Sequence, residues 1–478
     1  MQASLPGLQP KIRRYWWNNA SPAIHQRMAG IPQSNFWRWT VLPMAIAAVV
    51  VVVEIASDDR TGNASQSITA ATLPAPGYGP ADFPAALTEA DRLIELGREK
   101  LRRSPQEWTS LEMLARGLMS RARLTGDYRA WAEAERRLQE AFAIAPAGSG
   151  PLVAATTLAL STHRLDAAEQ GLAQLARSAV PHDANMQAGM AGVAGDIAFY
   201  RGSMAAAQGH YARGAALGPT NALEFRWAVL AMAQGDFANA DAAIRRSVAG
   251  ERRNTPQAMA EAAIRLGAHQ LAQGNWDGAE RWFVRADQLF PGHWLIEAHL
   301  VQARALRGDA AAADEMAALA ARSNSAEVMD AAAMLFRHKG DGANSRKWAA
   351  KAAALWEERL ALMPSAAYGH ALEHQLVFGD PAKALDLARK NVAERPFGEA
   401  RVLLAVALMT NNQPQAALNE IARAETSGWR SASLYAVKAE AAALSGRPDI
   451  AAAARARAQA INPKIFDYRT SLIWFSHG

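Results

Sequence analysis

Two histidines and a glutamate in the C-terminal half are spaced as in a class of metal-dependent hydrolases. The segment His370-Ala-Leu-Glu373-His374 has the pattern H-x-x-E-H. On a helix this spacing can bring both imidazoles to one face, toward zinc, while Glu373 acts as a general base. No later acidic residue stands out as a third ligand. A metal-dependent hydrolase is therefore the alternative reading of this chain, and ordinary polar groups on a helix are the simpler one.

Other patterns that would support catalysis are weak or missing. His293, Glu297 and His299 lie close together but lack regular ligand spacing. No phosphate-binding glycine loop, dinucleotide fingerprint or nucleophile elbow occurs in a suitable context. The chain has no cysteine, which excludes disulfides, thiolate metal sites and a cysteine nucleophile. We therefore expect a non-catalytic protein without a resident metal or cofactor.

A turn residue recurs along most of the chain and is usually followed five positions later by a small side chain. The intervals between successive turn residues range from 32 to 39. The turn positions are Gly126, His163, Gly202, Gly235, Gly274, Gly308, Gly340, Gly379, Asn412 and Gly446. Five residues after them stand Trp131, Ala168, Ala207, Ala240, Ala279, Ala313, Ser345, Ala384, Ala417 and Ala451. A period near 34 with glycine at a turn indicates stacked helix–turn–helix repeats.

The residue types explain the repeat physically. Glycine can adopt the positive φ that ends a helix, and alanine lets two helix backbones approach closely. In four units a proline stands 17 residues after the turn glycine and closes the second helix, as in Gly274 and Pro291. The abundance of alanine favours helix throughout. The sequence therefore predicts an all-α solenoid of about ten units over residues 83–463.

These residues resemble the tetratricopeptide repeat. One unit carries Trp227-Ala228, Gly235-Asp236-Phe237 and Ala240, and others repeat the same pattern. The departures are His163 in place of glycine, a turn at Gly308 without its aromatic residue, and the longer intervals. The resemblance implies a right-handed superhelix whose first helices line a concave groove that binds other proteins.

Counting back from the turn residues, the resemblance places a set of side chains in that groove. The family's lysine and asparagine clamp for acidic peptides is not evident, so a basic or apolar extended segment is the expected ligand. The simpler reading is that many of these residues are only solvated. The set is Asp196, Phe199, Phe225, Met232, Glu261, Gln302, Glu327, Arg337, His338, Glu373, Glu399 and Glu440.

The positive charge is concentrated near the N-terminus. The formal net charge is +6, but five basic residues precede any acidic residue, and the remainder has 46 basic against 45 acidic residues. Because the large repeat region is nearly neutral and lacks a basic stripe, we expect no nucleic-acid partner.

An uncharged run follows this basic segment. Residues 41–53 contain no charge, Trp37 and Trp39 precede them, and Glu54 follows. This pattern predicts one transmembrane signal-anchor helix at 37–57, with a cytoplasmic N-terminus and a periplasmic repeat domain. A cleaved signal peptide and the reversed topology are the alternatives.

The resulting domain plan has five parts. Residues 1–36 form a basic cytoplasmic tail, 37–57 the anchor in the bacterial inner membrane, and 58–82 a linker rich in Ser, Pro and Gly. Residues 83–463 form the repeats. Residues 464–478 are either a cap on the last repeat or an exposed aromatic docking tail. The whole predicts a membrane-anchored scaffold in an envelope assembly or export complex, and the sequence does not choose among polysaccharide export, pilus or secretion assembly, and cytochrome maturation.

Overall fold

The described part of the chain consists of α-helices joined by short turns. The computed structural model describes residues 76–178, 181–218, 220–248 and 254–475. Within these ranges it contains 21 α-helices and one 3-10 helix, and no strand. None of the helices in this part is both long and apolar enough to span a bilayer. The predicted tail 1–36 and anchor 37–57 lie outside the described residues.

Twenty of the helices form ten antiparallel pairs, which confirms the predicted all-α helical-repeat solenoid. Each predicted turn residue lies between the two helices of one pair. The pairs are α4 (Trp108–Thr125) with α5 (Tyr128–Ile144), α6 (Leu152–Ser161) with α7 (Leu165–Ala176), α8 (Ala184–Tyr200) with α9 (Met204–Leu217), α10 (Asn221–Ala233) with α11 (Phe237–Val248), α12 (Pro256–Ala272) with α13 (Trp276–Leu289), α14 (Trp294–Leu306) with α15 (Ala312–Ser323), α16 (Ala326–Lys339) with α17 (Gly342–Leu362), α18 (Pro364–Phe378) with α19 (Pro381–Glu394), α20 (Gly398–Thr410) with α21 (Pro414–Thr426), and α22 (Ala432–Leu444) with α23 (Pro448–Ile461). A single helix, α3 (Phe83–Arg103), precedes them, and the 3-10 helix η3 (Tyr468–Leu472) follows.

The turn residues have the backbone conformation that the sequence predicts, with one exception. Nine of the ten have positive φ, including His163 and Asn412. At a typical turn the amide of Asp236 donates to the Ala231 carbonyl at 2.9 Å, the long closing bond of a Schellman motif. Gly379 differs, with φ −112°. There the Gln375 side chain accepts from the next amide at 3.0 Å and replaces that closing bond.

The alanines after the turns occupy the closest helix crossings. Ala207, Ala240, Ala279, Ala384 and Ala417 have no exposed surface. Ala451 is only half-buried, because α23 belongs to the last pair and no further pair covers it.

The first helix of each pair lies inside the solenoid and the second lies outside. In α20 eleven of 13 residues are buried, and from Val402 to Met409 its sequence is apolar without interruption. In α23 two of 14 residues are buried. A helix that is apolar all round must be covered on every face, so the sequences themselves assign the first helices to the interior.

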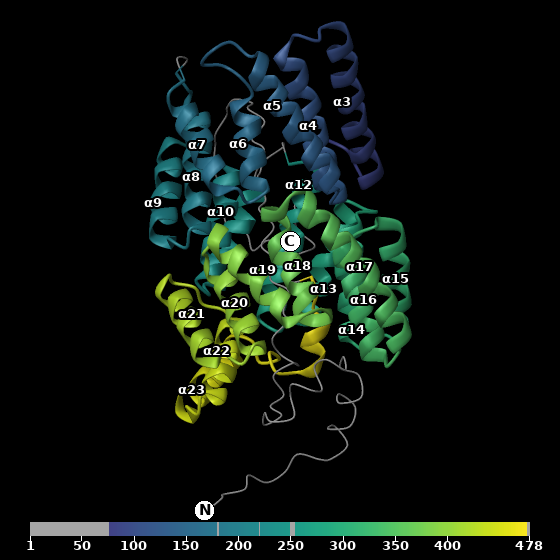
Figure 1. The fold of residues 1–478 in the computed structure, drawn as a ribbon, viewed down its shortest axis with the longest axis vertical. Helices are drawn as coiled ribbons and strands as arrows, with labels where there is room; N and C mark the ends of the chain where they lie inside the picture. The colour runs from purple at the N-terminus through teal and green to yellow at the C-terminus, as the bar shows by residue number, and fades with distance from the viewer. Residues whose placement is uncertain (1–75, 179–180, 219, 249–253, 476–478) are drawn as a thin grey trace, which may run out of the picture.

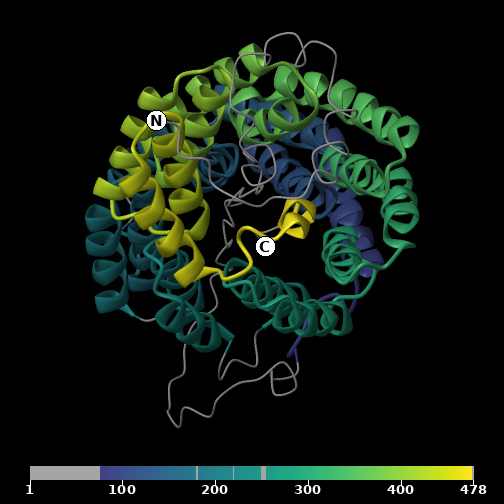
Figure 2. The ribbon, with the colours of Figure 1, turned by 90° about the horizontal axis from the view of Figure 1, so that it is seen from below.

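The pairs wind into a superhelix whose successive turns touch (Figures 1 and 2). The Arg430 amide donates to the Ala233 carbonyl at 2.8 Å, and these residues lie five to six pairs apart in the chain. The Trp294 indole donates to the Leu124 carbonyl at 2.9 Å across 170 positions. The helices surround a lumen, and Figure 2 shows the C-terminal segment entering it.

Several turn glycines lie where the next superhelical turn passes. A Cβ on Gly202 would lie 2.8 Å from the Pro396 carbonyl oxygen, and one on Gly274 would collide with the Asn462 side-chain oxygen. Gly308 has no atom within 4 Å of that position. Glycine at 202 and 274 therefore serves both the local turn and the contact between turns.

Replacing glycine by alanine at positions 308 and 274 distinguishes backbone strain within a turn from a collision between superhelical turns. Gly308→Ala introduces only backbone strain at φ 89° and should cost about 1 kcal/mol. Gly274→Ala adds the collision with Asn462 and should cost roughly 1–3 kcal/mol more. Thermal unfolding followed by circular dichroism should give a clearly lower midpoint for Gly274→Ala. Equal midpoints would contradict the role of Gly274 between turns.

Candidate binding surface in the lumen

The side of the first helices that faces the superhelix axis is called here the luminal face. It carries buried polar and charged side chains, unlike an ordinary apolar core. The buried polar residues include Gln302, Asp330, Glu373, His374 and Glu399. A buried polar group is costly unless it has a partner, so each of them needs a specific explanation.

Part of the predicted groove set belongs to a structural cluster on α8 and α10. Arg226 and Asp196 form an ion pair at 2.9 Å, and the Tyr211 hydroxyl donates to Asp196 at 2.9 Å. Phe199 and Phe225 are buried in the hydrophobic core. These predicted residues therefore support the packing of neighbouring pairs.

The remaining predicted residues are distributed along the luminal face. Glu261 accepts from Gln257 at 3.1 Å, and Glu440 is half-buried on α22. Met232 and Glu399 line a cavity between superhelical turns. Glu327 and Glu373 belong to a network around α18, and Gln302, Arg337 and His338 lie near the C-terminal segment; both places are described below.

The histidines of the H-x-x-E-H segment are held by two different acidic residues. His374 Nδ1 lies 2.6 Å from Asp330 Oδ1, and Asp330 Oδ2 accepts from the Trp356 indole at 2.8 Å. His370 Nδ1 lies 3.5 Å from the Glu373 carboxylate, and its ring stacks on Trp356. No group of three or more potential ligands that could hold a metal occurs among the described residues. The geometry therefore gives the hydrolase alternative no support.

Sequence reasoning missed Asp330, which organises this network. Its side chain is completely buried, and burial raises its pKa, against the opposing effect of His374. The available signal was an acidic residue in the middle of an apolar run of the helix Ala326–Lys339.

Arg359 links this network to the first superhelical turn. It pairs with Glu327 at 2.8 Å, donates to the Gly126 carbonyl at 3.3 Å, and lies over the Tyr128 ring at 4.7 Å. Desolvation is the largest effect on Glu327 and acts to raise its pKa. The charge of Arg359, with His370 and two hydrogen bonds, outweighs it and lowers the pKa of Glu327 to about 2. Because Glu327 and Arg359 both belong to the pair α16–α17, their ion pair holds the guanidinium in place for its contacts with Gly126 and Tyr128 in the other superhelical turn.

A different part of the luminal face holds the C-terminal segment Lys464–Phe475, called here the tail. Gln302 Oε1 accepts from the Trp474 and Phe475 amides at 2.6 Å each, and its Nε2 donates to the Phe475 carbonyl at 2.7 Å. Trp474 is 3% and Phe475 2% exposed. One side chain thus holds the backbone of an extended segment, which is how many proteins bind peptides.

Aromatic and cationic contacts complete the seat of the tail. The Phe475 ring meets His299 at 5.7 Å and Trp474 meets Phe378 at 6.1 Å, both between centroids. The exposed Tyr468 stacks on His338 at 5.6 Å. The exposed aromatic arm that the sequence allowed is therefore wrong for Trp474 and Phe475, because both side chains are buried in the lumen.

Trp276, the first residue of the outer helix α13, contacts two basic residues of the tail. Lys464 Nζ lies 4.2 Å and Arg469 Cζ 4.8 Å from its ring centroid. Arg469 also donates to the Leu306 carbonyl at 3.2 Å. Cations over a tryptophan face are attracted by the ring quadrupole. Basic and aromatic residues of the tail therefore have separate contacts.

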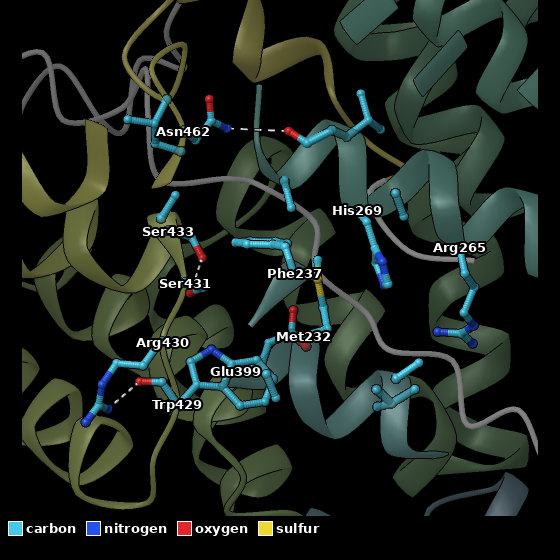
Figure 3. Close-up of a pocket in the computed structure, with 18 of the residues that line it drawn as sticks. Met232, Phe237, Arg265, His269, Glu399, Trp429, Arg430, Ser431, Ser433 and Asn462 are labelled. Atoms are coloured by element: carbon cyan, nitrogen blue, oxygen red, sulfur yellow. Dashed lines mark hydrogen bonds between the residues drawn. The ribbon is translucent and has the colours of Figure 1, made fainter. Parts of the chain in front are cut away.

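A second feature of the lumen is a cavity between α10–α12 and α20–α23 (Figure 3). Its walls are mainly apolar, with Arg265, Glu399 and Trp429 among the exceptions. Burial lowers the pKa of Arg265 to about 10. The Trp429 indole N–H is buried and has no hydrogen-bond partner within the described ranges. The cavity lies between two superhelical turns, where α12 of one turn faces the loop before α22 of the other.

Comparison with known proteins gives similarities of fold at low scores. No model of a known protein family matches the chain, and no curated protein matches it. Among solved structures it is similar to a tetratricopeptide repeat protein from Parabacteroides merdae, with 15% identity over 53% of this chain and 98% of that one, and a TM-score of 0.32. It is similar to yeast Tom70, with 12% identity over 78% of this chain and 87% of that one, and a TM-score of 0.36. It is also similar to pilF of Pseudomonas aeruginosa, with 18% identity over 45% of this chain and 96% of that one, and a TM-score of 0.26. At these scores the assignment of the fold rests on the ten helix pairs of the chain itself.

The Glu327–Arg359 pair should make stability depend on pH. Since the pKa of Glu327 falls from 4.5 to about 2 on folding, the pair stabilises the protein above about pH 4.5 and loses its effect toward pH 2. Glu327→Gln should lower the free energy of unfolding at pH 7 by on the order of 3 kcal/mol, because Arg359 stays buried without its partner. Urea unfolding at pH 7, 5, 4 and 3 should show the difference shrinking with acidity.

The exposed pair Arg98–Glu95 supplies the control for this measurement. Glu95→Gln should leave stability unchanged, because solvent screens surface pairs. A loss for Glu327→Gln that is constant with pH would show that the ion pair is not its cause.

Proposed function

We propose that this protein is a non-catalytic scaffold whose luminal face binds an extended segment of a partner protein. The observation that carries this proposal is the tail, which Gln302 holds through backbone hydrogen bonds. Backbone contacts of this kind accept any sequence of suitable shape, and side-chain pockets then add specificity. The luminal face is thus chemically suited to hold a peptide.

The arrangement of polar groups supports a binding role over a catalytic one. The candidate residues His370, Glu373 and His374 are engaged by neighbouring side chains inside the helix stack. His374 and Glu373 are almost completely buried. A reactive centre needs groups that can reach a substrate, and these groups stabilise packing instead.

We also propose that the scaffold is tethered to the bacterial inner membrane, with its repeats in the periplasm, and serves an envelope assembly or export complex. The support is the sequence pattern of residues 37–57, an uncharged run with tryptophans at its start and basic residues before it. Residues 58–82 provide a linker that would separate the repeats from the bilayer.

Site-specific crosslinking in the native membrane tests the binding role. A photoreactive phenylalanine analogue in place of Tyr468, which lies within the tail and is 51% exposed, should crosslink one partner protein. The same analogue at Val284, which is 42% exposed on the outer helix α13, serves as the matched control. Mass spectrometry of the adducts identifies the partner. Adducts of equal yield and identity at both positions would contradict binding at the luminal side.

A reporter fusion tests the topology. An enzyme that is active only outside the cytoplasm, fused after residue 82 of the chain, should be active because the basic N-terminal segment favours retention on the cytoplasmic side. A matched fusion after residue 36 should be inactive. The opposite pattern would reverse the proposed orientation.

A further inference from the structure

The tail is seated as a ligand would be, although it belongs to the same chain. Its internal backbone hydrogen bonds are the short-range bonds of turns, such as Ile473 to the Thr470 carbonyl at 3.1 Å. Its last two amides bond to a side chain, Gln302, which lies at a sequence distance of 172 and 173 residues. The backbone of α14 accepts one hydrogen bond from the tail, which runs from the Arg469 guanidinium to the Leu306 carbonyl at the C-terminal end of the helix.

The contacts of the tail define a recognition pattern. The cations at Lys464 and Arg469 meet Trp276, and the aromatic rings of Trp474 and Phe475 meet Phe378 and His299. Ile473 between these groups is completely buried. The pattern is thus one or two basic residues in a segment of turns and 3-10 helix, followed by an aliphatic residue and two aromatic residues beyond that helix.

We propose that the tail is an exchangeable occupant of the luminal face, and that the partner segment binds in its place with the same basic and aliphatic–aromatic–aromatic chemistry. This inference rests on the proposed scaffold function and specifies its ligand. The argument is that Trp276, Gln302 and Phe378 recognise a peptide backbone, cations and rings, features that a segment of another protein can present equally well.

Intramolecular attachment makes the tail a strong competitor. A short tether gives an effective concentration on the order of 1 mM, so a free peptide of the same sequence binds poorly while the tail is seated. Weakening the seated tail should therefore increase affinity for the peptide without any change in the luminal face. If the tail were a purely structural element, weakening it would not increase the affinity for the peptide.

The experiment uses the full chain and a fluorescein-labelled peptide with the sequence of residues 464–478. Fluorescence anisotropy should show that the Trp474→Ala/Phe475→Ala chain binds this peptide at least tenfold more tightly than the unmodified chain. Adding Gln302→Met to that variant should reduce the affinity at least tenfold, because the clamp on the peptide backbone is removed. A peptide with alanine at both aromatic positions should not bind.

Ser471→Ala provides the matched control within the tail, because the Ser471 hydroxyl donates to the Tyr468 carbonyl of the tail itself at 2.7 Å, and this variant should leave peptide affinity near that of the unmodified chain. If the double variant retains the circular dichroism and thermal transition of the unmodified chain yet does not bind the peptide, the proposal is wrong. If that variant does not fold, hydrogen exchange on the unmodified chain decides. Trp474 and Phe475 amides that exchange faster than those of α14 support an exchangeable tail, and equal rates overturn it.

The experiments distinguish an error in the proposed scaffold function from an error in the proposed exchange of the tail. The peptide assay needs no partner, so a chain that binds the peptide but crosslinks no protein would retain this luminal recognition and lose the proposed cellular role. A partner that crosslinks at Tyr468 but is not displaced by the peptide would instead refute the tail-like chemistry of its binding segment.

Discussion

The close contact between successive turns of the superhelix is the constraint on which the rest of this structure depends. The turns meet at positions such as Gly202 against Pro396 and Gly274 against Asn462, where a side chain would intervene. The helix pairs themselves are thin at their crossings because alanines such as Ala279 are fully buried there. A looser superhelix would expose the first helices to water, and their apolar sequences would not tolerate it.

This compactness explains why the interior is both polar and buried. The first helices of one turn face those of others, so their charged residues must find partners inside the protein. Asp330 does so with His374 and Trp356, and Arg359 does so with Glu327. A buried pair adds little net stability, but leaving one partner alone is costly. These contacts join α16, α17 and α18, which are consecutive in the chain, and Arg359 also reaches Gly126 and Tyr128 of another superhelical turn.

The seat of the tail follows from the same geometry. A superhelix that winds through more than one turn brings helices from its middle near its own end, so α14 and α16 can receive the segment that follows α23. Solenoids usually protect their last repeat with a polar cap. Here Trp474 and Phe475 beyond α23 are buried in the lumen instead. The binding surface and the chain end are thus parts of one arrangement.

The sequence by itself determined the repeat, because its causes are local. A positive φ at Gly235, alanine at a helix crossing and a proline after the second helix act within one pair, and their recurrence predicts ten pairs. Through its resemblance to the tetratricopeptide repeat it also named Gln302 and His338 as groove residues, by their distance from the turn residues. Only the tertiary structure decided what those residues contact. The small rotation between neighbouring pairs accumulates over the array, and this sum sets which pairs meet after a full turn. Asn462 meets Leu271 across 191 positions for that reason, and no local pattern in the sequence encodes such a partner.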